Sequence, residues 1–189
     1  MADDWESALR KLTRETPKTE VMDAVMNAMR GDLPDRPSAL VMSAATDVAI
    51  QLALVYALSI NTQDRVNSMF YGDGPFSAFD KKIVAAFNLS IVGPTTATNL
   101  KVIKGVRNVF AHSLMEVTFS ANQIVRACAR IKLTKASQLP VDIENERKTR
   151  FLFGCACNEI YQGILQFVSG QIMAGEMGRR KLLSSPILP

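Results

Sequence analysis

The stretch Leu40 to Ile60, LVMSAATDVAIQLALVYALSI, restricts the possible folds more than any other part of the chain. Its single charged residue is Asp47, and a helix that is apolar around its whole circumference is normally enclosed by other elements. The stretch is long enough to cross a bilayer. However, Asp47 would cost about 3 kcal/mol near the membrane centre. We therefore predict a buried central helix from about Ser38 to Ser59, with no contact with a membrane.

Apolar residues elsewhere recur every three or four positions and rarely alternate, so the sequence contains almost no strand signals. This pattern predicts an all-α protein that folds as a single-domain helical bundle. The 189 residues, of which 48% are apolar, are enough to build one core without a disulfide or a metal. The expected helices span about 3–14, 19–30, 38–59, 62–70, 77–89, 95–111, 120–133 and 143–172.

The helix near 143–172 is expected to be the long C-terminal helix of the bundle. Its apolar residues alternate four and three positions apart, which predicts lengthwise packing against another helix. They are Phe153, Cys157, Ile160, Ile164 and Phe167. The helix at 120–133 is expected to open with a capping box, because Gln123 follows Ser120 by three residues.

Composition divides the chain into three parts. The segment GDLPDRPS at 31–38 contains two prolines and a glycine and predicts a linker. We expect 1–37 to form an N-terminal helical arm and linker, 38–172 the helical domain, and 173–189 a flexible tail. The acidic N-terminus lacks the basic and apolar regions of a secretory signal.

The three cysteines are Cys128, Cys155 and Cys157, an odd number without paired C-x-x-C motifs. This usage argues against a disulfide framework and a zinc site. We therefore expect a cytoplasmic protein with no metal and no cofactor.

The segment 102–113, VIKGVRNVFAHS, contains the residues best suited to chemistry. His112 is the only histidine and titrates near neutral pH, whereas Arg107 is a permanent planar cation suited to phosphate. Asn108 and Lys104 accompany them. Five residues rotate the side-chain direction by about 140° on an unbroken helix. Arg107 and His112 can therefore share a site only if the helix ends near Ala111 or if two chains combine.

This segment fits the Arg-x4-6-His signature of the HEPN superfamily, in which asparagine usually follows the arginine. Together with the run YGDGPFSAFDKKIVAAFNLSIV at 71–92, it resembles the mannitol operon repressor family over about 38–131. The matching residues are Gly72 to Pro75 in the loop, Lys82, Ile83, Ala86 and Leu89 in the next helix, and Arg107, Asn108, Phe110 and His112 in the last segment. Phe76 replaces the usual leucine, and Lys104-Gly105 stands where the family pattern has an arginine.

The resemblance implies an all-α regulatory protein without a helix-turn-helix, and we find no base-reading helix pair in the sequence. The expected function is transcriptional regulation through a protein partner, with no direct sequence-specific reading of DNA. We also expect a homodimer.

The alternative is a metal-independent HEPN-type ribonuclease, serving as a toxin or a defence component. Arg107, Asn108 and His112 would be catalytic, and RNA would be the substrate. His112 could act as base or acid and Arg107 could stabilise the phosphorane. One histidine cannot easily supply both proton transfers, so the two copies in a dimer would share them.

A purely structural interpretation of the same residues is also open. In it, Arg107 forms a buried ion pair with Asp47, and His112 caps the end of its helix. Gly72 to Pro75 would form a turn rather than a phosphate loop, because no strand precedes them.

Overall fold

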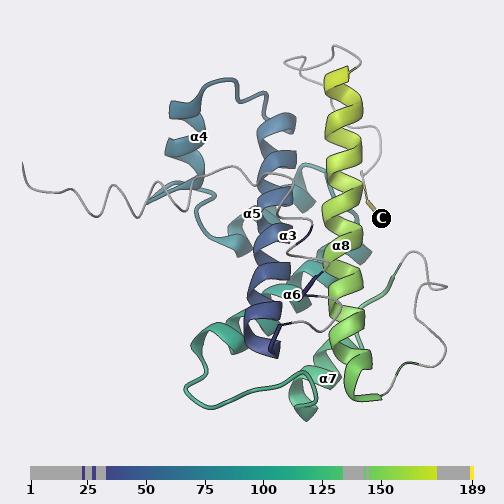
Figure 1. The fold of residues 1–189 in the computed structure, drawn as a ribbon. Helices are drawn as coiled ribbons and strands as arrows, with labels where there is room; N and C mark the ends of the chain where they lie inside the picture. The colour runs from purple at the N-terminus through teal and green to yellow at the C-terminus, as the bar shows by residue number, and fades with distance from the viewer. Residues whose placement is uncertain (1–22, 24–26, 29–32, 134–142, 144, 174–187) are drawn as a thin grey trace, which may run out of the picture.

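The computed structural model describes residues 23, 27–28, 33–133, 143, 145–173 and 188–189. Within them the chain forms six helices and, apart from an isolated bridge, no strand (Figure 1). The helices are α3 (Asp35–Ala57), α4 (Gln63–Phe70), α5 (Phe79–Asn88), α6 (Pro94–His112), α7 (Asn122–Cys128) and α8 (Asn145–Met173). The predicted all-α, single-domain bundle with a long C-terminal helix is confirmed. The arm and the tail lie largely outside the described residues, although Asp23, Asn27 and Ala28 are helical.

Helix α3 begins at Asp35, three residues before the predicted start. Pro37 lies in its first turn, where a missing N–H removes no hydrogen bond because the first four N–H groups of a helix have no partner within it. The predicted linker is therefore too long, since 35–37 belong to the central helix.

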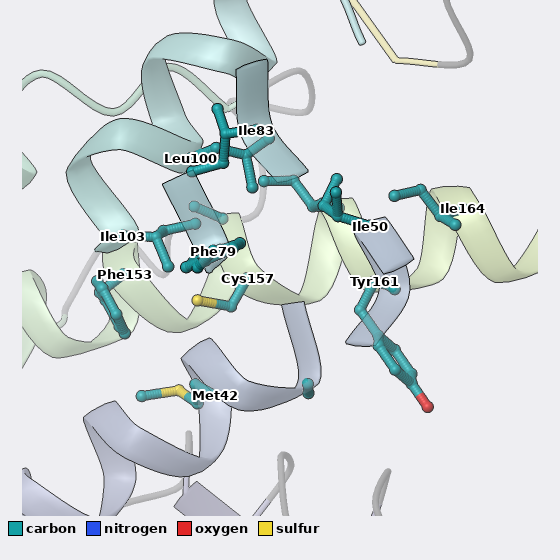
Figure 2. Packing of buried hydrophobic residues seen from close by; sticks show 14 of the residues in the cluster. Met42, Ile50, Phe79, Ile83, Leu100, Ile103, Phe153, Cys157, Tyr161 and Ile164 are labelled. Atoms are coloured by element: carbon teal, nitrogen blue, oxygen red, sulfur yellow. The ribbon is translucent and has the colours of Figure 1, made fainter. Parts of the chain in front are cut away.

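Helices α3 and α8 lie side by side and run in the same direction (Figure 1). Three contacts along the two helices show the parallel direction, because the residue numbers rise together on both. They are Asp35 with Arg150, Thr46 with Cys157, and Tyr56 with Phe167. Figure 2 shows Met42 of α3 near Cys157 of α8, with Ile103 of α6 and Phe79 of α5 beside them. The predicted lengthwise packing of α8 is confirmed, because Phe153, Cys157, Ile160 and Ile164 are buried.

By length and composition alone, α3 is also the one described helix that could cross a membrane. In the bundle, however, 56% of its most apolar window is buried against other helices. Ala39, Met42 and Ile50 are fully enclosed. The predicted packing of this helix into the core of the bundle is confirmed.

An aromatic cluster attaches the loop after α6 to the core. The ring of Phe119 lies 4.9 Å from that of Phe110 and 5.4 Å from that of Phe153, measured between ring centroids. All three side chains are buried, and each such pair contributes about 0.5–1.5 kcal/mol beyond its buried area. The loop that follows His112 is therefore firmly held.

The predicted capping box at Ser120 is wrong. Helix α7 begins at Asn122 and ends at Cys128, and its N-cap is Ala121, which has no side-chain hydrogen bond. The Ser120 hydroxyl instead pairs with that of Thr118 at 2.7 Å. Phe119 explains the difference, because its burial fixes the backbone of 118–120 as a turn.

Candidate functional site

Helix α6 continues without a break through the residues that the sequence singled out. It ends at His112, and the N–H of Ser113 still donates to the carbonyl oxygen of Val109 at 3.0 Å. Because the helix does not end near Ala111, the side chains of Arg107 and His112 leave it about 140° apart. A single chain therefore does not bring these two groups together.

The three candidate catalytic residues all reach the surface. Arg107 and His112 are exposed and Asn108 is half-buried. The guanidinium of Arg107 donates from Nη1 to Oδ1 of Asn108 at 3.4 Å, a long contact between neighbours. Lys104 makes a partly exposed ion pair with Asp80 at 3.6 Å. This end of α6 is thus a polar surface open to solvent.

The predicted buried pair of Asp47 with Arg107 is wrong, because Arg107 is exposed and Asp47 has another partner. Oδ1 of Asp47 lies 2.8 Å from Nζ of Lys82 on α5, and the Lys82 side chain is only 5% exposed. The Lys82 ammonium also donates to Oε1 of Gln51 at 3.1 Å. The amide of Gln51 in turn donates to the hydroxyl of Tyr71 at 3.2 Å.

Sequence reasoning placed Lys82 in a motif but did not identify it as the partner of Asp47. The position of Lys82 on α5 could have indicated that it is buried. It shares one face of the helix with three apolar residues at helical spacing, and all four are buried: Phe79, Lys82, Ile83 and Ala86. The chain Asp47, Lys82, Gln51 and Tyr71 connects α3 and α5 to the loop that starts at Gly72. That loop is a turn, as predicted, and Gly72 has the positive φ of +60° that glycine tolerates best.

An open groove of about 800 Å³ runs between α6 and α7. Its lining is mainly apolar, and Lys101 and Arg130 are the charged members. The remaining residues are Thr98, Val102, Gly105, Val106, Val109, Val117, Ala121, Gln123, Ile124 and Ala127. At Gly105, an added Cβ would meet nothing within 4 Å, so the α6 backbone lies open to an incoming group.

Two exposed apolar side chains lie in the loop after α6 and line a separate hollow with residues 34–36. Leu114 and Met115 follow α6 directly and are 101% and 76% exposed. Arg36 fixes their backbone, since its Nη2 donates to the carbonyl oxygens of Ser113 at 2.8 Å and Met115 at 3.1 Å. Both side chains are therefore held out to solvent from a braced loop.

The cysteines do not form a reactive or metal-binding centre. Burial raises the pKa of Cys128 and Cys157 to about 12 and that of Cys155 to about 11. The thiols are thus protonated at neutral pH, whereas the thiolate is the nucleophile and the metal ligand. In the part of the chain that the structure describes, no group of three histidine, cysteine or acidic side chains could hold a metal ion.

Together these features define an all-α helical bundle with an open, apolar and cationic groove beside a polar helix end. Comparison with protein-family models, curated proteins and solved structures gives no match for this chain. The resemblance to the mannitol operon repressor family therefore depends on the motif residues alone.

Proposed function

We propose that this protein is a transcriptional regulator that resembles the mannitol operon repressor family and acts through a protein partner. The observation that carries the proposal is the groove between α6 and α7, with its open glycine and its two cations. Contiguous exposed apolar surface of this kind commonly marks a site of interaction.

The mainly apolar lining of the groove suits a helix of the partner. Amphipathic helices bind by inserting apolar side chains spaced at three and four residues into such grooves. Gly105 permits the close approach of a second backbone, because no side chain covers α6 there. Lys101, Arg130 and the net charge of +4 favour an acidic partner.

Filling the groove at Gly105 is expected to weaken partner binding about tenfold or more, which corresponds to 1.4 kcal/mol or more. The probe is a labelled amphipathic helical peptide with leucines on one face and glutamates on the other, and fluorescence anisotropy measures its Kd. Gly105→Leu should weaken binding without unfolding the chain, because the position is open and glycine is a poor helix former. Lys101→Glu should weaken it as well.

Gly170→Leu is the matched control, because its Cβ also meets nothing within 4 Å and it lies on α8 outside the groove. Rising salt should weaken the wild-type complex. Equal affinities for the wild type, Gly105→Leu and Lys101→Glu would exclude the groove as the binding site.

A second candidate function is the metal-independent ribonuclease, and one observation favours it. Arg107, Asn108 and His112 are all accessible at the same end of α6, next to Leu114 and Met115. These two exposed apolar side chains suit a contact between two copies of the chain. Such a homodimer would supply two histidines for the two proton transfers of RNA cleavage.

If the ribonuclease function is real, the purified protein should cleave a mixed RNA pool in EDTA and leave 2′,3′-cyclic phosphate ends. His112→Ala and Arg107→Ala should each lower the rate by about 100-fold or more, because each removes a proton-transfer or charge-stabilising group. Arg126→Ala, which removes an exposed cation from α7, is the control. Intact RNA with the wild type, or a monomer by light scattering, would exclude this mechanism.

A further inference from the structure

The amino end of α6 is occupied by a distant segment of the chain. The N–H of Gly93 donates to the carbonyl oxygen of Leu188 at 2.7 Å, and the N–H of Thr96 donates to an oxygen of Pro189 at 2.7 Å. Val92 and Leu188 form an isolated parallel bridge. The first N–H groups of a helix have no partner within it, and Gly93 supplies no capping side chain. The segment thus takes the place of a cap.

Two glycines on different elements create the space for this segment. A Cβ on Gly163 of α8 would lie 2.6 Å from Cδ2 of Leu188. A Cβ on Gly93 would lie 2.6 Å from the carbonyl carbon of Pro189. Contacts this short do not occur with real side chains. A larger residue at Gly93 would displace the backbone of Pro189, and a larger residue at Gly163 would force the Leu188 side chain out of its position.

We propose that the amino end of α6, together with Gly163, is a docking site for a short extended peptide with a leucine followed by a proline. Residues 188–189 fill this site within the same chain. The site recognises two backbone oxygens of the peptide, which accept hydrogen bonds from Gly93 and Thr96, and one apolar side chain. Proline suits the second position, because it has no N–H to leave unpaired and its φ is preset for an extended backbone.

This site is distinct from the groove between α6 and α7. Its contacts involve Val92, Gly93, Thr96 and Gly163, and none of these residues lines the groove. A partner segment of the same chemistry would compete with residues 188–189. The tether within the chain gives them a high effective concentration, so a competitor meets an occupied site.

Hydrogen exchange in the full chain tests whether residues 188–189 occupy the site at the amino end of α6. The amides of Gly93 and Thr96 should be protected in the wild type. Leu188→Asp and Gly163→Leu should each accelerate the exchange of these two amides by about tenfold or more. In both variants the segment 188–189, which supplies the hydrogen-bond acceptors, leaves the site. Gly170→Leu is the matched control on α8, where an added side chain meets open space. Unchanged exchange at Val106 would show that α6 itself is intact.

A labelled pentapeptide, Ser-Pro-Ile-Leu-Pro, tests binding between molecules. Leu188→Asp vacates the site, so this variant should bind the peptide more tightly than the wild type does. Combining it with Gly163→Leu should abolish binding. The proposal fails if Leu188→Asp leaves Gly93 and Thr96 protected. It also fails if the vacated site does not bind the peptide, or if the double variant binds it equally well.

Discussion

Replacing Arg150 with alanine is expected to lower the free energy of unfolding by about 3–5 kcal/mol, the usual cost of removing one partner of a buried ion pair. The Arg150 guanidinium lies 3.1 Å from Oδ1 of Asp35, and these two side chains are only 13% and 24% exposed. It also donates to the carbonyl oxygens of Ala28 at 2.7 Å and Leu33 at 2.6 Å. Alanine would leave one carboxylate and two carbonyls without this donor.

The shape of the guanidinium matters as well as its charge. Arg150→Lys should recover little of the lost stability, because one ammonium cannot reach all the acceptors that the planar fork serves. Lys148→Ala, an exposed position on the same helix, should change stability by less than about 0.5 kcal/mol. Urea unfolding followed by circular dichroism gives these values. Similar losses for Arg150→Ala and Lys148→Ala would mean that the pair contributes nothing.

Asp47→Asn is the second substitution with a large expected effect, about 3 kcal/mol of lost stability. It leaves the Lys82 ammonium, 5% exposed, beside a neutral amide. Lys82→Met should cost less, since the remaining Asp47 side chain is 31% exposed and water can still solvate its charge. The combined Asp47→Leu and Lys82→Met variant should be closer to the wild type than Asp47→Asn is.

A double-mutant cycle on Asp47 and Lys82 measures this coupling directly. The exposed pair of Lys104 with Asp80 is the internal comparison, and Asp80→Asn should cost less than about 1 kcal/mol. If Asp47→Asn and Asp80→Asn lose the same amount of stability, the Lys82 ammonium is stabilised by groups other than the Asp47 carboxylate.

Helical periodicity was sufficient to predict most of the fold. The expected helices at 95–111 and 143–172 agree with α6 and α8 to within two residues at each end. Long, strongly periodic segments are recognisable because each turn adds an apolar residue to the same face. The short helix expected at 62–70 also agrees with α4 to within one residue, whereas the one expected at 120–133 is longer than α7 at both ends. The packing of Phe119 into the core set its start, a tertiary contact that no local pattern at Ser120 contains.

The candidate site was only partly predictable for the same reason. The sequence identified Asp47 as the single charged residue of the central helix, but its partner depends on how α5 crosses α3. Lys82 serves because its long aliphatic stem is compatible with a buried face. The groove was not predicted at all. Its wall combines α6 with α7, which are separate in the sequence, and the structure leaves the apolar side chain of Val109 exposed there.

The parallel pairing of α3 with α8 has a consequence for synthesis of the chain. Thr46 emerges from the ribosome 111 residues before Cys157, its neighbour in the folded bundle. At the usual translation rates this delay lasts roughly 6–20 s. During that interval α3, the most apolar of the described helices, has not yet met α8, against which it packs most extensively. The face of α3 that packs on α8 therefore stays uncovered by its partner helix until α8 has been synthesised.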